Sequence, residues 1–244
     1  MKISILIPVY NEFRTFPQVL DRVRNARLPE GCEKEIIVID DGSTDGTGQL
    51  IGECSRAGLI VAHRSAANVG KGMAIRAGLS LASGDVLLIQ DGDLEYDPDD
   101  YIRLVEPILS GRAEVVYGSR FLGRPQNMAL KNQIANWTLT SAANLLYNAN
   151  LTDEATAYKA FRASILRALN LECRRFEFCP EVTAKLSRLG HHIIEVPISY
   201  NARGIADGKK IRARDGFEAL WTLVKYRFAR ENHFALMSKQ VKLS

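Results

Sequence analysis

The sequence predicts an α/β fold in which a mostly parallel sheet is covered by helices on both faces. Through the first hundred residues, short apolar runs alternate with amphipathic helical patterns, which is the order of consecutive βαβ units. The 244 residues are 46% hydrophobic and 25% charged, so the chain can bury a real core as a soluble globule. That length suits one α/β domain with an appended segment, or two small domains.

Five strands and four helices are predicted in the first 120 residues. The strands are Ile3–Val9, Glu35–Ile39, Leu59–Ala62, Val86–Gln90 and Glu114–Tyr117. The helices are Thr15–Ala26, Thr47–Arg56, Lys71–Leu81 and Asp99–Leu109. Ser43, Thr44 and Asp45 offer N-cap oxygens to the second helix. Gly58 is expected to end that helix, and Gly84 is expected to end the third.

Beyond residue 120 the order of elements is less regular. The pattern predicts, in turn, a helix, a strand, a helix and a strand over Leu130–Tyr147, Ala157–Phe161, Glu181–Arg188 and His192–Ile198. The last pattern, over Arg212–Arg230, is an amphipathic basic helix. Such a helix can lie on an anionic bilayer. More often it packs its apolar face on its own domain, and this second interpretation is slightly favoured.

The cysteines and the apolar runs suggest a cellular compartment. The four cysteines show no CxxC spacing, which disfavours a zinc site or a disulfide framework and favours a reducing cytoplasm. The first apolar run is too short for a signal peptide. No stretch approaches the roughly 18 apolar residues of a spanning helix. We therefore expect a cytoplasmic protein that is soluble or lies peripherally on the cytoplasmic face of a membrane.

Charge is distributed unevenly along the chain. Residues 1–100 carry 10 Lys and Arg against 16 Asp and Glu, a net of −6, and residues 101–244 carry 22 against 12, a net of +10, which together give the overall +4. An acidic first half suits a metal site, and a basic second half suits an anion or a charged surface. An uneven solvated surface would explain the same numbers. No recognised nucleic-acid motif accompanies the basic residues, so nucleic acid is not an expected partner.

Acidic and aromatic side chains follow three of the predicted strands. The first strand leads into Tyr10 and Glu12, the second into Asp40 and Asp41, and the fourth into an acidic turn. In parallel α/β sheets ligands bind beyond the carboxyl ends of the strands. A carboxylate there can accept hydrogen bonds from a base or ribose, and an aromatic ring can stack on the base. These strand ends are therefore the predicted nucleotide site.

The acidic turn after the fourth strand is Asp91-Gly92-Asp93. Alternate residues of a strand share a side, and the intervening glycine permits a tight bend, so both carboxylates can reach one divalent ion. Mg²⁺ and Mn²⁺ prefer oxygen ligands together with substrate phosphates. Taken alone, the motif is better explained as a common Asp-Gly turn. Three acidic strand ends in one sheet favour a metal site instead.

The segment NVGKG, residues 68–72, follows the third strand and opens a helix. Its backbone amides could meet a phosphate, and Lys71 could add a positive charge. The segment does not match a phosphate-cradling P-loop. No GxGxxG follows the first strand, which argues against a dinucleotide dehydrogenase. Tight packing of a loop against a helix explains Gly70 and Gly72 equally well.

Taken together, these motifs resemble the family 2 glycosyltransferases, specifically the branch that contains dolichyl-phosphate mannose and glucose synthases. The matching strings are IPVYNE (7–12), DDGSTDGT (40–47), NVGKG (68–72), SGDVLLIQDGDLEYDP (83–98), GSRF (118–121), LTDEATAYKAFR (151–162), FEFCPEVTAKL (176–186), EVPISY (195–200) and GKKI (208–211). They run in family order over nearly the whole chain. Each string alone is weak evidence, but the ordered set is specific.

The resemblance implies a GT-A (Rossmann-like) fold, a nucleotide-diphosphate sugar donor, Mg²⁺ or Mn²⁺, and inversion at the anomeric carbon. It implies that residues 1–120 hold the donor and the metal, and that residues 121–244 hold the acceptor within one continuous domain. Carried over by position, it implies a nucleotide pocket of Pro8, Tyr10, Glu12 and Asp41, a metal pair of Asp91 and Asp93 with Gln90 or Glu95 as neighbours, and phosphate-binding groups at Arg120, Arg203 and Lys209. Many members carry carboxy-terminal transmembrane helices that this sequence lacks, so a membrane subunit is a conceivable partner.

The acceptor decides which further residues take part. A polyprenyl or dolichyl phosphate needs no strong base, because the second pKa of a phosphate monoester lies near 6. It needs cations, which the basic second half supplies. A hydroxyl acceptor would need a carboxylate base, for which Asp153 and Glu154 are candidates, although turn or helix capping is slightly favoured for both.

The leading hypothesis is therefore transfer of a hexose, from a donor of the GDP-mannose or UDP-glucose type, to a polyprenyl phosphate. The residues expected to act in catalysis are Asp93, Arg120, Arg203 and Asp153. Two alternatives stay open. One is transfer to a saccharide or other hydroxyl, and the other is a catalytically silent subunit that binds nucleotide sugars.

Overall fold

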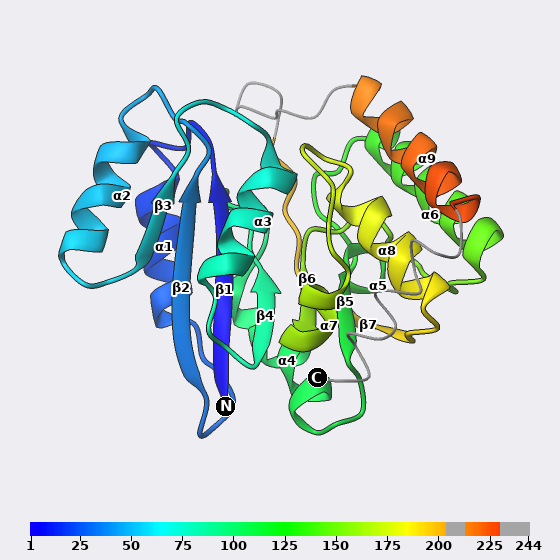
Figure 1. The fold of residues 1–244 in the computed structure, drawn as a ribbon, viewed down its shortest axis with the longest axis horizontal. Coiled ribbons are helices and arrows are strands. Elements are labelled where there is room, and N and C mark those ends of the chain that lie inside the picture. Colours follow the sequence, from blue (N-terminus) through cyan, green and yellow to red (C-terminus); the bar gives the residue numbers. More distant parts are fainter. Residues whose placement is uncertain (204–212, 230–244) are drawn as a thin grey trace.

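The computed structural model describes residues 1–203 and 213–229. Within them the chain forms a seven-stranded sheet of order β3-β2-β1-β4-β6-β5-β7 (Figure 1). The strands are β1 (Lys2–Val9), β2 (Glu33–Asp40), β3 (Val61–Arg64), β4 (Val86–Ile89), β5 (Val115–Ser119), β6 (Lys159–Arg162) and β7 (Ile193–Pro197). Strand β6 is antiparallel to β4 and β5, and the other neighbouring strands are parallel, so the predicted mostly parallel sheet is confirmed.

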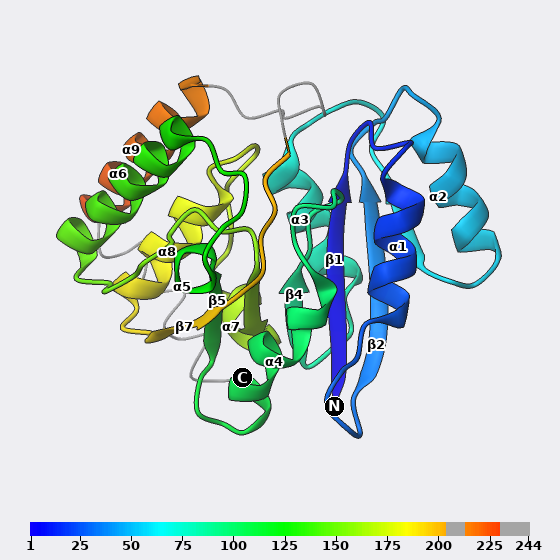
Figure 2. The same cartoon turned by 180° about the vertical axis from the view of Figure 1, so that it is seen from behind.

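Helices cover both faces of the sheet (Figures 1 and 2). They are α1 (Phe16–Asn25), α2 (Thr47–Arg56), α3 (Lys71–Leu81), α4 (Tyr101–Leu109), α5 (Arg120–Gly123), α6 (Leu130–Tyr147), α7 (Ala163–Ala168), α8 (Phe178–Arg188) and α9 (Ala213–Arg227). Successive residues of β2 enter opposite cores: Val38 belongs to the core that includes residues of α1 and α4, whereas Ile37 and Ile39 belong to the core that includes residues of α3, α7 and α8. This alternation explains why the strand is apolar at consecutive positions. None of the helices in the described ranges has the length and hydrophobicity of a transmembrane span.

Three glycine and capping predictions have different outcomes. Gly58 follows α2 with φ of +71°, as expected for a residue that ends a helix. Gly84 does not end α3, which stops at Leu81; a Cβ on Gly84 would come within 2.6 Å of Ser4 Oγ, so this glycine lets the loop approach β1. The residue before α2 is Gly46, and of the three predicted capping side chains only Asp45 accepts a hydrogen bond from the first helical amide.

Glu35 of β2 joins three segments at the amino-terminal edge of the sheet. Its carboxylate forms an ion pair with Lys2 (Nζ–Oε1 2.7 Å), accepts from the amide and hydroxyl of Ser83 at 2.9 and 2.7 Å, and accepts from Ser4 Oγ. Burial raises the pKa of Glu35, but the hydrogen bonds from Lys2, Ser4 and Ser83 outweigh it and lower the pKa to about 2. The ionised carboxylate is therefore stabilised by the fold.

Glu35→Gln is expected to lower the free energy of unfolding at pH 7 by about 1–2 kcal/mol. Because the pKa of Glu35 is lower in the folded state, this stabilisation is present above pH 4.5 and is lost as the pH falls towards about 2. Urea unfolding at several pH values should show that the difference in free energy of unfolding between wild type and variant becomes smaller as the pH falls. Glu33→Gln, an exposed change on the same strand, is the control. A gap that stays constant with pH would contradict the assignment.

Candidate active site

Arg203 gathers three carboxylates at the carboxyl ends of the central strands. Its Nη1 lies 3.0 Å from Glu12 Oε1, its Nη2 lies 2.9 Å from Asp93 Oδ2, and its backbone amide donates to Glu95 Oε1 at 2.8 Å. Glu12 follows β1, and Asp93 and Glu95 follow β4. Arg203 and Glu12 are 191 residues apart in the chain. The structure thus brings together side chains that the sequence placed at separate strand ends.

Asp91 and Asp93 each face a cationic side chain. Lys71, the first residue of α3, forms an ion pair with Asp91, and Arg203 forms one with Asp93. Burial and the charge of Asp91 raise the pKa of Asp93 to about 7, against the opposing effect of Arg203. A carboxyl group with this pKa changes its charge near neutral pH, so the cations around it decide its state.

The acidic turn offers two carboxylates to a metal ion. The two carboxylates are close enough that the negative charge of Asp91 raises the pKa of Asp93. A Cβ on the intervening Gly92 would lie 3.1 Å from Pro8 O, so the turn packs closely against the end of β1. Among residues 1–203 and 213–229, no group of three or more His, Cys, Asp or Glu side chains could hold a metal. A pair of carboxylates fits Mg²⁺ or Mn²⁺, which take their remaining ligands from phosphates and water.

Asp41 is buried beneath the loop that precedes α3. Its Oδ1 accepts from the amide of Val69 at 2.9 Å and its Oδ2 accepts from the amide of Gly70 at 2.8 Å. Burial raises the pKa of Asp41, and these two backbone hydrogen bonds lower it in part. Asp41 therefore holds the NVGKG segment in place, and each of its oxygens already has a donor.

The first amides of α3 also have protein partners. The amide of Gly72 donates to Arg175 O at 2.8 Å and that of Met73 donates to Arg174 O at 3.0 Å. A Cβ on Gly70, whose φ is +104°, would lie 2.5 Å from Arg174 O. The structure therefore favours loop packing over phosphate binding for this segment, because a helix terminus binds an anion only through amides that lack other acceptors.

The remaining donor-side residues differ in accessibility. Pro8 lies near the end of β1, beyond Leu6, the last residue of β1 that pairs with β4. Tyr10 directly follows β1 and is half-buried. Gln90 does not face a ligand site: it is fully buried, and its Oε1 accepts from Tyr101 at 2.7 Å and from Tyr158 at 2.5 Å. Its Nε2 donates to the backbone carbonyl of residue 91 at 2.9 Å. Gln90 is thus placed to position the acidic turn rather than to bind a ligand, which corrects the expected role.

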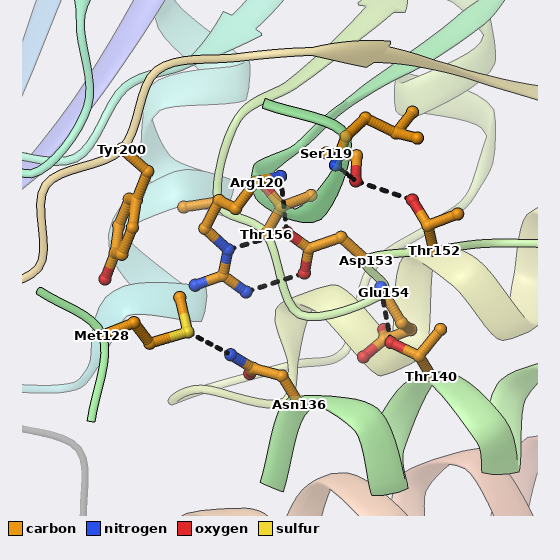
Figure 3. A network of polar contacts seen from close by, with 12 residues as sticks. Ser119, Arg120, Met128, Asn136, Thr140, Thr152, Asp153, Glu154, Thr156 and Tyr200 are labelled. Atoms are coloured by element: carbon orange, nitrogen blue, oxygen red, sulfur yellow. Dashed lines mark hydrogen bonds and ion pairs between the residues drawn. The ribbon is translucent and has the colours of Figure 1, made fainter. Parts of the chain in front are cut away.

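Arg120 and Asp153 form a buried ion pair (Figure 3). The Nε and Nη2 atoms of Arg120 both lie 2.7 Å from oxygens of Asp153, and the Arg120 amide donates to the same carboxylate at 2.9 Å. Asp153 is completely buried and Arg120 is 6% exposed. The guanidinium lies 5.1 Å from the centroid of the Tyr200 ring. Both oxygens of Asp153 are therefore engaged, which argues against a role as a base, whereas the bond from the Arg120 amide caps the first turn of α5, as the slightly favoured interpretation expects.

Glu154 is no more accessible than its neighbour. It is fully buried, its Oε1 accepts from Thr183 Oγ1 at 3.2 Å, and its amide donates to Thr140 Oγ1 at 3.1 Å. Lys159, also fully buried, donates to its backbone carbonyl at 2.8 Å. Burial raises the pKa of Glu154 above its usual range, against the opposing charge of Lys159. A hydroxyl acceptor therefore has no access to this carboxyl group, and its printed side-chain partner is the Thr183 hydroxyl rather than a helix amide.

The sequence singled out Tyr10 but not Tyr96 and Tyr200, two further aromatic residues of the site. Tyr200 donates from its hydroxyl to Glu95 at 2.8 Å, and its ring stands edge-on to Tyr96 at a centroid distance of 5.0 Å. The string EVPISY contains Tyr200, but no local pattern marks it as a partner of Arg120. Lys209, expected to bind phosphate, lies outside the described residues.

Comparison with known proteins identifies relatives over most of the chain. A sequence model described as Glycosyl transferase family 2 matches residues 4–169. The chain is 33% identical to the undecaprenyl-phosphate mannosyltransferase of Micrococcus luteus, over 86% of this chain and 87% of that protein. It is 30% identical to the polyprenol monophosphomannose synthase of Mycolicibacterium smegmatis, over 84% of this chain and 79% of that protein.

Solved structures provide a comparison of folds. Glucosyl-3-phosphoglycerate synthase from Mycobacterium tuberculosis, crystallised with Mn²⁺, UDP-glucose and phosphoglyceric acid, superposes with a TM-score of 0.71 at 21% identity. The match covers 94% of this chain and 80% of that chain. The GT-A fold expected from the sequence is thereby confirmed.

Proposed function

Because the chain belongs to glycosyl transferase family 2, in the branch of the dolichyl-phosphate mannose synthases, we propose that it transfers a hexose from a nucleotide-diphosphate sugar to a polyprenyl phosphate. The reaction inverts the anomeric carbon, with the acceptor phosphate oxygen as nucleophile and the nucleoside diphosphate as leaving group. The two relatives named above act on polyprenyl substrates, which supports this choice of acceptor. The donor is of the GDP-mannose or UDP-glucose type.

The donor lies across the carboxyl ends of β1, β2 and β4, next to Tyr10 and the acidic turn. A divalent ion held by Asp91 and Asp93 would supply Lewis-acid stabilisation of the departing diphosphate. Lys71 and Arg203 contact these carboxylates, so two cationic side chains stand where a diphosphate would approach. In this proposal they orient the donor and balance its charge.

The observation that carries the choice of acceptor is the engagement of Asp153. A hydroxyl acceptor needs a base with a free oxygen, whereas both oxygens of Asp153 are bound to Arg120 and Glu154 is fully buried. A phosphate acceptor is already ionised near neutral pH and needs cations instead. The described cations at this end of the site are Arg203, which stands between donor and acceptor and contacts Asp93, and Arg120, which is paired with Asp153 and lies beside Tyr200. This arrangement favours phosphate transfer over the hydroxyl alternative.

The proposal predicts that label from a nucleotide sugar becomes soluble in organic solvent. The purified full chain would be incubated with radiolabelled GDP-mannose or UDP-glucose, Mn²⁺ and a short-chain polyprenyl phosphate in detergent. Label extracted with the lipid supports the proposal, and the donor that labels it names the sugar. The expected product releases its sugar in mild acid, as a glycosyl phosphate should.

Two other results would contradict this function. Label that appears only in water-soluble saccharide would support a hydroxyl acceptor. Complete inactivity with every donor, together with donor binding seen as a thermal shift, would support the silent-subunit alternative. Asp91→Asn serves as the control that separates enzymatic transfer from carry-over of label.

A further inference from the structure

The segment that follows β7 joins the two sides of the site. It runs from β7 across the middle of the molecule (Figure 2). The amide of Asn201 donates to Glu95 O at 2.9 Å, and the amide of Gln126 donates to Tyr200 O at 2.9 Å. Residues 200 and 201 are therefore held on one side by the loop that carries the acidic turn and on the other side by the loop after α5.

The side chain of Tyr200 contacts groups on both sides of this segment. Its hydroxyl donates to Glu95 Oε2 at 2.8 Å, two residues beyond Asp93. The guanidinium of Arg120 lies over its ring, 5.1 Å from the centroid, and stands between this ring and the Asp153 carboxylate (Figure 3). Tyr200 is only 5% exposed. One buried side chain thus connects the loop of the acidic turn to the Arg120–Asp153 ion pair.

The two contacts restrict Tyr200 in different ways. A hydrogen bond from a hydroxyl to a carboxylate is short and about twice as strong as a neutral one. A guanidinium over an aromatic face is attracted by the quadrupole of the ring, most strongly where water is excluded. Because a tyrosine side chain has only two torsion angles, holding both its ring and its hydroxyl fixes the whole side chain. Tyr200 is therefore a rigid spacer between Glu95 and Arg120.

Neighbouring aromatic residues support the spacer. Tyr96 stands edge-on to Tyr200 at a centroid distance of 5.0 Å and is stacked on Tyr158 at 4.5 Å. Tyr158 in turn donates to Gln90, whose amide donates to the backbone of the acidic turn. The ring of Tyr200 is thus connected to that turn by a second route, and a displacement of the ring is opposed from two directions.

We propose that Tyr200 is a positioning residue for sugar transfer, which sets the separation between the acidic turn and Arg120. The inference rests on the proposed function, in which the acidic turn holds the donor and Arg120 is a cation of the acceptor side. Inverting transfer needs the acceptor oxygen in line with the departing diphosphate, and a misplacement of about 1 Å can lower the rate by about 100-fold. Tyr200 acts on this alignment through Glu95 and Arg120.

Two variants of Tyr200 separate its contacts. Tyr200→Phe removes the hydroxyl and keeps the ring, so it tests the bond to Glu95 alone. Its kcat should fall by about 10- to 100-fold, while the KM values for donor and polyprenyl phosphate each change by less than about twofold. Tyr200→Leu also removes the aromatic face from Arg120, and its KM for the acceptor should rise by about fivefold or more. This separation of kcat from KM distinguishes positioning from binding.

Tyr117 provides the matched control. It is fully buried, and its hydroxyl shares a hydrogen bond with Thr183 Oγ1 at 3.0 Å, away from the acidic turn. Tyr117→Phe removes one buried hydroxyl and should keep the kcat of the wild type. Thermal melts of all the variants give the folded fraction at the assay temperature, so that rates are compared per folded molecule.

Two kinetic results would contradict the role of Tyr200. Equal kcat values in Tyr200→Phe and Tyr117→Phe would show that the hydroxyl contributes to stability alone. A higher KM for the acceptor in Tyr200→Phe, with kcat unchanged, would place the residue in the binding of the acceptor instead.

Hydrogen exchange tests the spacer without any substrate. Tyr200→Leu should speed amide exchange both at residues 93–96 and at residues 120–123, because the ring is held by both segments. Faster exchange in only one of these segments, or in neither, would overturn the proposal. A wild type that transfers no sugar to polyprenyl phosphate would contradict the proposed function, and the exchange result would then decide the inference on its own.

Discussion

Asp91→Asn and Asp93→Asn are each expected to lower kcat by about 10³-fold or more while the protein stays folded. Each change keeps the shape of the side chain and removes the charge that a divalent ion needs. Asp93 is buried and its pKa is raised to about 7, so its ionised form is disfavoured by the fold. Loss of that charge should therefore change the free energy of unfolding by no more than about 1 kcal/mol. Initial rates at saturating donor and Mn²⁺, together with thermal melts, give the two quantities.

The exposed Asp99, six residues beyond Asp93, provides a control for a change of charge in the same loop region. Asp99→Asn should retain nearly full activity. If Asp93→Asn turned over at a rate close to that of the wild type, the acidic turn would not be the metal site. A thermal shift on adding Mn²⁺ and nucleotide, present in wild type and absent in Asp91→Asn, would test ion binding apart from turnover.

Asp153→Ala is expected to destabilise the fold by about 3–5 kcal/mol, because it leaves the Arg120 guanidinium buried without its countercharge. Urea unfolding measures this loss. The double variant Arg120→Met with Asp153→Leu should recover most of the stability, since an apolar pair of similar size can replace a buried ion pair. Its activity should stay low, because the cation on the acceptor side is gone.

The same variants distinguish a structural carboxylate from a catalytic base. A base could be removed without a large change in stability, and its loss would appear mainly in kcat. If Asp153→Ala unfolded like the wild type but lost turnover, Asp153 would be acting on substrate and the hydroxyl alternative would return. The expected outcome is the reverse, with stability and activity falling together.

Local sequence signals were sufficient for much of the fold. The helices predicted at Thr47–Arg56, Lys71–Leu81 and Leu130–Tyr147 match α2, α3 and α6 end to end, because their patterns are long enough to show a helical period. The short helices α5 and α7 were missed, since four and six residues hold too few turns for a period to appear. Strand β3 begins two residues later than Leu59, within the usual uncertainty of an element's ends.

The candidate site was predictable in its position but not in its pairings. Parallel strands bring their carboxyl ends to one edge, so the positions of Glu12, Asp41 and Asp91 followed from the order of elements. The partners of those side chains depend on contacts between distant segments. Arg203 reaching Glu12 and Asp153 closing on Arg120 are such contacts, and no local pattern encodes them.

The basic amphipathic pattern over Arg212–Arg230 had two interpretations, a helix on a bilayer surface and a helix packed on its own domain. Helix α9 packs on its own domain through Leu223 and Tyr226, as the favoured interpretation expects. It also leaves Phe217 and Trp221 exposed on its solvent side. The neighbouring α6 contacts α9 through Ala143, a contact that could not be predicted before the two helices were placed together.

The reversed direction of β6 matters for anyone who would recombine this chain with a relative. Because β6 runs against β4, its first residues meet the last residues of β4, and Tyr158 reaches Gln90 across that junction. A crossover near residue 120 would take these two side chains from different parents. Chimeras should therefore fold well only when both parents carry the Tyr158 hydroxyl and the Gln90 amide at the junction of β4 and β6, whatever their overall similarity.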